Sequence, residues 1–460
     1  MAPNHEGHDA TEGTDFSITS LVTDSRRRPL EARTLVNLIS ILLVVALIIG
    51  TAPWWSGVAL SLWHRVFPPP AYTGALVFED GLATLTAHAA TDGHPVWHLA
   101  NIPQNSGFYR DGATLYVLPN GQQRLIALRV SDGHQRWTQP LSAANISGND
   151  ILTFVGSSPT ILYIKVFFTA YETTSLLNID KQTGNLLSEM AGICYAVPAP
   201  PTLILADCRE GEREHTVTSD GGDGDSRQLQ VLSGRGIRAI VRDNYIIDVA
   251  VVPGVELRFT ALDLRTGAIV WQANTVTGIP YFGATVIIIE SNPQDGSAST
   301  DTYIALDAAT GAHLWSLTRT GENASIFFLT TAHTDVDTFT LNEQTLIATD
   351  ERTGVTRWTL PTAAAAAAFE TWRAEFDNET LYFADRDQLL AVDAVTGKVR
   401  WHLDDGGHVP TSLALGGGNL YEITGGHLLA RDPHTSKVRW QQAVASSADM
   451  CAACNSTAGT

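Results

Sequence analysis

The chain has 460 residues, a formal net charge of −19, and 44% hydrophobic against 17% charged residues. This apolar content argues against wholesale disorder, because disordered chains combine low hydrophobicity with high charge. Only 29 Lys and Arg residues stand against 48 Asp and Glu residues. The composition does not favour the basic surface that a nucleic-acid-binding protein needs, and we expect no nucleic-acid partner.

A hydrophobic segment near the N-terminus predicts a transmembrane helix over residues 34–55. The 21 residues from Leu35 to Trp55 contain no charged side chain, and about 20 apolar residues cross a bilayer as a helix. The alternatives are a cleaved signal peptide and a buried core helix. A long polar lead and a poor cleavage-site match at Gly50-Thr51-Ala52-Pro53 disfavour the signal peptide. We expect one crossing, since no second apolar run of this length follows.

The segments on either side of this helix predict its orientation. Four arginines precede it, at Arg26, Arg27, Arg28 and Arg33. Positive residues favour the cytoplasmic side. We therefore expect residues 1–33 to be a disordered cytoplasmic tail, residues 56–74 to be a juxtamembrane linker, and the remaining chain to lie outside the cell membrane.

One sequence pattern recurs through the rest of the chain: an apolar strand, Asp, two residues, Thr-Gly, three residues and Trp. Four near-complete copies are FTALDLRTGAIVW (259–271), YIALDAATGAHLW (303–315), LIATDERTGVTRW (346–358) and LLAVDAVTGKVRW (389–401). The copy at 428–440 has Ser436 in place of glycine, two copies at 85–97 and 125–137 replace Thr with Asp, and the copy at 176–188 lacks Trp.

The chemistry of this pattern is structural. The Asp side chain can form a hydrogen bond with the backbone a few residues further on and so start the turn. The glycine supplies a position with φ above zero. Such glycines are Gly267, Gly311, Gly354 and Gly397. The tryptophan begins the next strand, and we interpret it as packing between neighbouring repeats. The repeat tryptophans are Trp97, Trp137, Trp271, Trp315, Trp358, Trp401 and Trp440.

The spacing of the repeats predicts an all-β propeller over residues 75–443, with about four strands per blade. Turn signals recur every 39 to 51 residues, except for one interval of 83 residues between Gly184 and Gly267. Gly224 divides that interval, with Gln228 at the tryptophan position. We expect eight blades if this unit is a loop and nine if it is a blade; seven is a further alternative. The segment after Trp440 is expected to complete the first blade, and residues 444–460 to form a flexible tail.

The pattern L-x-A-x-D-x-x-T-G-x-x-x-W resembles the repeat of the quinoprotein alcohol dehydrogenase-like propellers, called pyrroloquinoline quinone (PQQ) repeats. The resemblance implies a propeller fold. The superfamily contains PQQ-dependent dehydrogenases and cofactor-free scaffolds. The dehydrogenases carry an adjacent cysteine pair, and no two cysteines are adjacent here. We therefore assign no catalytic, cofactor-binding or metal-binding residue, and PQQ with calcium remains the alternative.

The four cysteines are interpreted as structural. Cys194 and Cys208 flank a proline-rich turn and are candidates for a disulfide within one blade. Cys451 and Cys454 form a CxxC motif without the following His that haem attachment needs, so a disulfide or two free thiols is expected.

These observations favour a single-pass membrane protein with an extracytoplasmic propeller. The leading hypothesis is a non-enzymatic scaffold that binds a protein or an envelope polymer. The alternatives are a PQQ-dependent dehydrogenase and a sugar-binding sensor.

Overall fold

A computed structural model describes the chain from residue 72 to residue 451. The ranges outside this description are 1–71, 142–145, 148–149, 170–172, 200–201, 209–213, 221–225, 255, 277, 284, 292–299, 321–326, 334–336, 343–344, 362–373, 378, 386–387, 405–409, 411, 445–448 and 452–460. The predicted tail and membrane helix fall in the first of these ranges. Among the described residues, none belongs to a helix that is long and apolar enough to cross a membrane.

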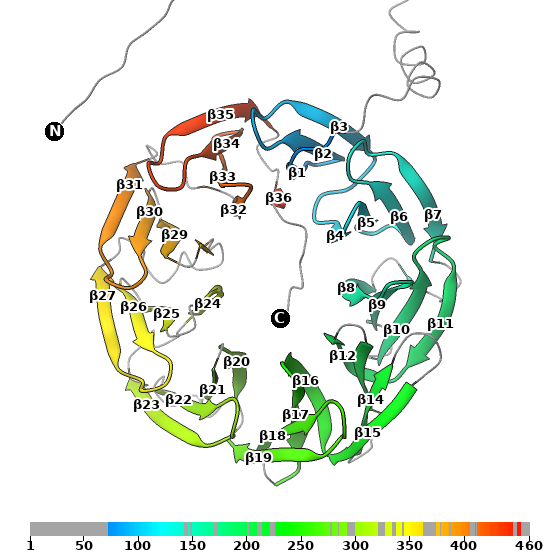
Figure 1. Cartoon of the computed structure of the whole chain (residues 1–460), viewed down its shortest axis with the longest axis vertical. Coiled ribbons are helices and arrows are strands. Elements are labelled where there is room, and N and C mark those ends of the chain that lie inside the picture. Colours follow the sequence, from blue (N-terminus) through cyan, green and yellow to red (C-terminus); the bar gives the residue numbers. More distant parts are fainter. Residues whose placement is uncertain are drawn as a thin grey trace, which may run out of the picture. The chain divides into compact units, whose positions relative to one another are not determined.

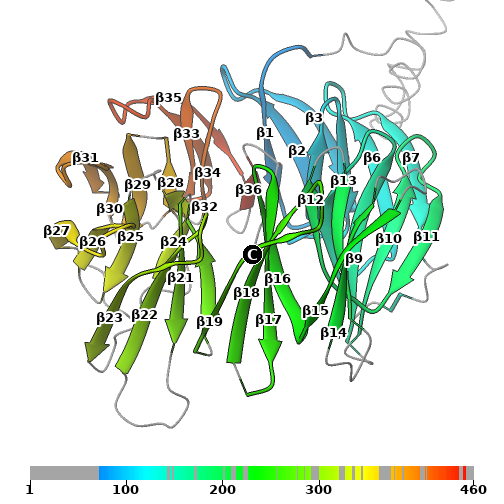
Figure 2. The same cartoon turned by 60° about the horizontal axis from the view of Figure 1, so that its bottom comes forward.

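The described residues form nine four-stranded antiparallel sheets, which are arranged as the blades of a ring (Figure 1, Figure 2). Blades are numbered here in chain order, and the strands of each are given from the innermost to the outermost. Blade 1 contains β36 (Asp449–Cys451), β1 (Leu76–Asp80), β2 (Thr84–Ala89) and β3 (Pro95–Ala100). Blade 2 contains β4 (Gly107–Asp111), β5 (Thr114–Leu118), β6 (Arg124–Arg129) and β7 (Gln135–Pro140). Blade 3 contains β8 (Ile151–Ser157), β9 (Ile161–Phe168), β10 (Thr173–Asp180) and β11 (Leu186–Ala191).

Blades 4 to 6 continue the ring. Blade 4 contains β12 (Ile193–Ala199), β13 (Thr202–Asp207), β14 (Glu214–Asp220) and β15 (Ser226–Ser233). Blade 5 contains β16 (Arg235–Arg242), β17 (Tyr245–Val252), β18 (Glu256–Asp263) and β19 (Ile269–Thr275). Blade 6 contains β20 (Ile279–Phe282), β21 (Val286–Ser291), β22 (Thr300–Asp307) and β23 (His313–Thr320).

Blades 7 to 9 bring the chain back to blade 1. Blade 7 contains β24 (Phe327–His333), β25 (Asp337–Asn342), β26 (Thr345–Asp350) and β27 (Thr356–Pro361). Blade 8 contains β28 (Ala374–Phe376), β29 (Thr380–Asp385), β30 (Gln388–Asp393) and β31 (Val399–Asp404). Blade 9 contains β32 (Ser412–Gly416), β33 (Asn419–Thr424), β34 (His427–Arg431) and β35 (Val438–Ala443).

The nine sheets differ from the eight blades that the spacing favoured. The difference is blade 4, which lies in the long interval between Gly184 and Gly267. Its strands β14 and β15 pair in antiparallel register, from Glu214 opposite Ser233 to Asp220 opposite Ser226. The segment around Gly224, which is outside the described residues, therefore connects two strands of a blade.

The two ends of the propeller meet in blade 1. Strand β36 pairs antiparallel with β1, with Phe78 opposite Cys451 and Asp80 opposite Asp449. This confirms the expectation that the segment after Trp440 supplies the inner strand of the first blade. It also corrects the expected tail, because three residues of the range 444–460 form a strand.

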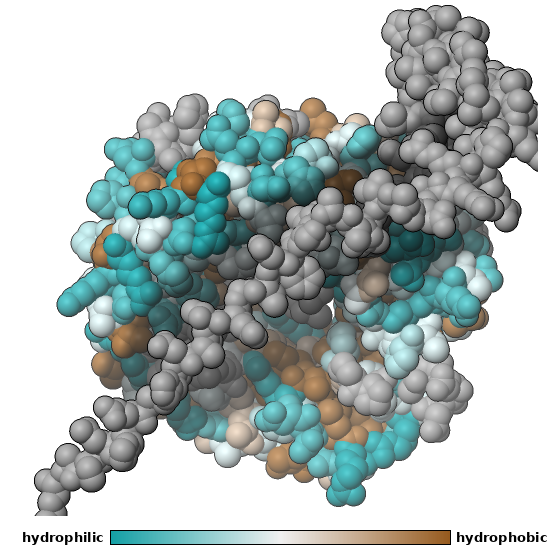
Figure 3. Space-filling view, turned by 45° about the horizontal axis from the view of Figure 1, so that its top comes forward, coloured by the Kyte–Doolittle hydropathy of each residue, from teal (hydrophilic) through white to brown (hydrophobic). Residues whose placement is uncertain are grey.

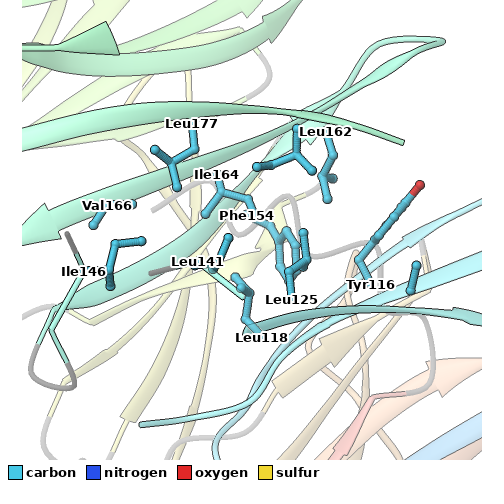
Figure 4. Close-up of a cluster of buried hydrophobic side chains, with 12 residues drawn as sticks. Tyr116, Leu118, Leu125, Leu141, Ile146, Phe154, Leu162, Ile164, Val166 and Leu177 are labelled. Atoms are coloured by element: carbon cyan, nitrogen blue, oxygen red, sulfur yellow. The ribbon is translucent and has the colours of Figure 1, made fainter. Parts of the chain in front are cut away.

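The hydrophobic core lies between blades. The second and third strands of a blade are the most buried, and all five residues of β5 are buried. Successive residues of a strand face opposite neighbours. In β29, Leu381 and Phe383 pack into the cluster shared with blade 7, whereas Tyr382 packs into the cluster shared with blade 9. Figure 4 shows such a cluster between blades 2 and 3.

Candidate functional site

The antiparallel blades give the ring two faces. Face A is where the innermost strands begin and where the second strand of each blade turns into the third. Face B carries the Asp-x-x-Thr-Gly turns between the third and fourth strands. The two faces therefore differ in sequence character, because face B is built from the repeat and face A from residues that vary between repeats.

The repeat aspartates on face B bind their own turns. Oδ1 of Asp263 accepts hydrogen bonds from the backbone N–H of Arg265 at 3.0 Å and from the backbone N–H and hydroxyl of Thr266 at 2.6 and 2.7 Å. The hydrogen bonds from Thr266 lower the pKa of Asp263. Asp180, Asp307 and Asp350 make the same set of contacts. The hydrogen bonds of these carboxylates therefore stabilise the turns.

The repeat tryptophans connect neighbouring blades. Six of them donate the indole N–H to a backbone carbonyl of the next blade: Trp97 to Val130 (2.8 Å), Trp137 to Lys181 (3.0 Å), Trp315 to Glu351 (2.8 Å), Trp358 to Ala394 (2.9 Å), Trp401 to Pro433 (2.8 Å) and Trp440 to Ala90 (3.0 Å). Trp271 is buried, and its ring lies against Gly311 of the next blade.

The turn glycines make this contact sterically feasible. A Cβ on Gly354, at φ 70°, would lie 2.7 Å from Cδ2 of the Trp315 ring. Gly397 and Gly311 lie in the same way against Trp358 and Trp271. Gly267 differs, because it lies against the backbone of Leu229 in blade 4, which, like blade 3, lacks the tryptophan.

The junction between blades 4 and 5 uses a buried polar cluster instead. The Tyr195 hydroxyl donates a hydrogen bond of 2.5 Å to Oδ1 of Asp248, and Nε2 of His215 lies 2.9 Å from the same oxygen. Nδ1 of His215 lies 2.8 Å from the carbonyl oxygen of Gly234. The side chains of His215 and Asp248 are 0% and 1% exposed. We call Tyr195, His215 and Asp248 the junction triad.

The electrostatics of the junction triad favour a charged histidine. Burial alone would lower the pKa of His215, but the hydrogen bond and the charge of Asp248 raise it above its usual value. Burial, together with the nearby Asp248 carboxylate, also raises the pKa of Tyr195 well above its usual value. Both shifts favour the protonated forms of His215 and Tyr195 beside Asp248, whose side chain is 1% exposed.

A disulfide lies beside the junction triad. Cys194, next to Tyr195 in β12, is bonded to Cys208, which follows β13. The Cys208 sulfur lies 3.8 Å from the carbonyl oxygen of Gly236 in blade 5. Cys451 ends β36, and Cys454 lies outside the described residues, so the predicted CxxC chemistry stays a prediction.

Aliphatic side chains are exposed on face A at blades 5 and 6. They are Ile237 (41%), Val251 (44%), Val276 (40%) and Ile279 (58%). On the face that Figure 3 displays, hydrophobic residues stand among hydrophilic ones. We call these four residues the aliphatic patch. Arg235, which pairs with Val251 across the sheet, is exposed beside it.

In the described part of the chain, no three His, Cys, Asp or Glu side chains gather as a metal site. Sequence reasoning missed the junction triad and the aliphatic patch, because neither lies at a repeat position. The one available signal was the loss of the tryptophan and of the Asp-x-x-Thr-Gly turn in blade 4.

Comparison with known proteins agrees with the repeat. The sequence family described as "Outer membrane protein assembly factor BamB" matches residues 79–278, 255–404 and 376–458. No curated protein matches the sequence.

Several solved structures are similar to this chain. The structure of BamB from Moraxella catarrhalis has 13% identity and a TM-score of 0.40, covering 76% of this chain and 89% of that one. A eukaryotic initiation factor has 11% identity and a TM-score of 0.57, covering 82% and 97%. Quinohemoprotein alcohol dehydrogenase ADHIIG from Pseudomonas putida HK5 has 12% identity and a TM-score of 0.37, covering 73% and 66%. At such identities the likeness concerns the fold alone. The family match spans most of the propeller, so the chain belongs to the family of outer membrane protein assembly factor BamB.

Proposed function

We propose that this protein is a non-enzymatic scaffold that binds a protein partner through face A of its propeller. The aliphatic patch is the observation that supports this proposal most strongly. Ile237, Val251, Val276 and Ile279 are each 40% to 58% exposed at the same end of two neighbouring blades. Grouped exposed aliphatic side chains are typical of protein contact surfaces. A family named for outer membrane protein assembly is consistent with a protein partner.

The geometry of blade 5 supports a rigid contact surface. Ile237 lies at a bulge, where the register of β16 on β17 shifts between Gly236 and Arg238. A bulge re-aims side chains at a sheet edge. The junction triad holds this blade against blade 4. Within blade 4, the disulfide joins β12 to the residue that follows β13. A rigid surface loses little conformational entropy when it binds.

The quinone-dependent alternative finds less support in the repeat residues. The aspartates on face B accept hydrogen bonds from their own turns. The tryptophans donate hydrogen bonds to the next blade. PQQ carries three carboxylates, which a chain with a net charge of −19 repels unless basic groups gather. We therefore propose that neither PQQ nor calcium is a cofactor.

We further propose that residues 34–55 anchor the protein in the cell membrane and that the propeller is extracytoplasmic. The uncharged 21-residue segment and the arginines before it support this orientation. The Cys194–Cys208 disulfide supports it independently, because disulfides persist in oxidising compartments and are rare in the cytosol.

Site-specific photo-crosslinking in intact cells tests the protein-binding proposal. A benzophenone amino acid at Ile279, on face A, should give one discrete protein adduct. The same amino acid at Val395, which is 67% exposed on face B, is the matched control and should give none. Ile237→Asp should abolish the Ile279 adduct without unfolding the protein. Equal adducts at both positions, or an adduct unaffected by I237D, would contradict the proposal.

A further inference from the structure

A second feature of face A is a pocket between blades 2 and 3, far along the chain from the aliphatic patch. Its volume is about 270 Å³. It is bounded by the end of the β3–β4 connection at Asn105, by the β5–β6 loop over 119–123, and by the beginning of β8 at Ile151. Sites for drug-sized ligands span roughly 300–1,000 Å³. This pocket is therefore sized for a ligand of about one ring.

The floor of the pocket is apolar. Leu118 and Ile146 line it, and both belong to the buried cluster between blades 2 and 3, at 5% and 4% exposure (Figure 4). Leu152 also lines the pocket and packs on the same cluster. A pocket with this floor offers apolar contact to the C–H groups of a ligand.

The rim of the pocket is formed by neutral amides with spare hydrogen-bonding capacity. The side-chain amides of Asn105 and Gln123 make no hydrogen bond with any other described residue, although both line the pocket. Asn120 uses only Nδ2, which lies 3.4 Å from the carbonyl of Gln104, and Gln122 uses only Nε2, 3.4 Å from the carbonyl of Asn101. Amide oxygens and N–H groups are therefore left to face a ligand that both donates and accepts.

Backbone hydrogen bonds fix the two loops that carry these amides. Asn105 adopts φ 61°, a backbone conformation that residues other than glycine rarely adopt. Its backbone N–H donates a hydrogen bond of 2.8 Å to Oδ2 of Asp80. The N–H of Asn120 is held by the Ser106 hydroxyl at 3.1 Å. The β3–β4 connection and the β5–β6 loop thus fix each other across the pocket.

The pocket has almost no charge to offer. Asp150 is the one ionisable side chain among its described lining residues. Its two carboxylate oxygens already accept the N–H of Ser147 at 2.7 Å and the N–H of Thr169 at 3.1 Å. The carboxylate would repel an anion, and its hydrogen bonds to the backbone leave it less available to a cation. The lining therefore suits an uncharged ligand with several hydroxyl groups and an apolar ring face.

We propose that this pocket binds one ring of a neutral saccharide, with the amides of Asn105, Asn120 and Gln123 on its hydroxyl groups and Leu118 and Ile146 beneath its C–H face. The site is independent of the proposed protein contact, because it is built from blades 2 and 3, whereas the aliphatic patch belongs to blades 5 and 6. A failure of one proposal leaves the other standing.

The test is saturation-transfer NMR on the purified full chain in detergent, with cellobiose, maltose, trehalose and N,N′-diacetylchitobiose as neutral probes and glucuronic acid as a charged probe. At least one neutral probe should bind saturably with a Kd of about 1 mM or tighter. The double variant Asn120→Ala/Gln123→Ala should weaken that Kd by about tenfold or more. Gln441→Ala, which removes an exposed amide from the outer strand β35, should leave it unchanged.

A second variant separates recognition from folding. Asn105→Gly keeps the backbone conformation at φ 61° but removes the amide, so it should weaken binding without lowering stability. No saturable binding by any neutral probe would overturn the proposal. Equal binding of glucuronic acid, or equal affinity in the double variant and in Q441A, would overturn it as well.

Discussion

The indole Nε1 of Trp440 donates a hydrogen bond of 3.0 Å to the carbonyl oxygen of Ala90, across 350 residues of sequence. The same indole lies against Gly93, the turn glycine of blade 1. The contact between the last and first blades is therefore of the same kind as the contact between Trp315 of blade 6 and Gly354 of blade 7. Together with the pairing of β36 on β1, it closes the ring.

Trp440→Ala should open this closure. Removing a buried aromatic side chain costs roughly 3–5 kcal/mol, and Trp440 is 8% exposed. Hydrogen exchange should become faster in blades 1 and 9, with blades 4 to 6 unchanged. Trp440→Phe keeps an aromatic ring but loses the N–H and part of the indole, so it should destabilise the protein less than Trp440→Ala. Unaltered protection of blade 1 in W440A would contradict this closure.

Ser436→Gly should stabilise the protein. Ser436 replaces the repeat glycine and adopts φ 61°, a conformation that costs a residue with a Cβ about 1 kcal/mol. The backbone N–H bond from Ser436 to Asp432 at 2.9 Å is retained in the variant. Chemical denaturation should show the gain. Ser436→Ala is the control and should give none, because alanine keeps the Cβ.

The junction triad should make stability depend on pH. The pKa of His215 is raised in the folded protein, so its protonation stabilises the fold below the usual histidine pKa of about 6.5. That contribution is lost as pH rises through the raised pKa. The groups facing His215 are Asp248, Tyr195 and the carbonyl of Gly234.

Urea unfolding of the wild type should therefore give a free energy that falls as the pH rises above the usual histidine pKa of about 6.5. His215→Gln should flatten this dependence, whereas His98→Gln, at an exposed position of β3, should not. A wild-type free energy that rises with pH in this range would have the opposite sign and would refute the raised pKa of His215.

Much of the propeller follows from the sequence, because the residues of each repeat act locally or on the adjacent repeat. The role of Gly354 depends only on its own turn and on the Trp315 ring of the neighbouring blade. The blade count was harder to predict, since blade 4 keeps the strands but has lost the tryptophan and the turn. β-strand pairing tolerates such losses, because the backbone supplies the ladder whatever side chains it carries.

The candidate sites follow from the sequence much less. The junction triad brings together residues 53 and 33 positions apart at places that do not recur in other blades. The aliphatic patch depends on a register shift in β16. The pocket depends on left-handed Asn105 and on two loops of different blades. None of these features has a periodic signal, because each is set by tertiary packing.

Topology has its own test. Protease added to intact cells whose outer barrier has been opened should digest the propeller and leave residues 1–55 protected. Replacing Arg26, Arg27 and Arg28 with Glu should reduce this asymmetry, because positive residues set the orientation. Lys→Glu substitutions at Lys398 and Lys437, far from the predicted helix, serve as controls. A propeller that resists the protease until the cell membrane is lysed would contradict the orientation.

Calorimetric titration of the purified full chain with PQQ, in the presence and absence of calcium, tests most directly the claim that the repeat residues are structural and that the protein is a scaffold. We expect no saturable heat at micromolar PQQ and no reduction of an artificial electron acceptor when alcohols are added. Stoichiometric binding of PQQ, or quinone absorbance that co-purifies with the protein, would contradict the scaffold and favour the dehydrogenase.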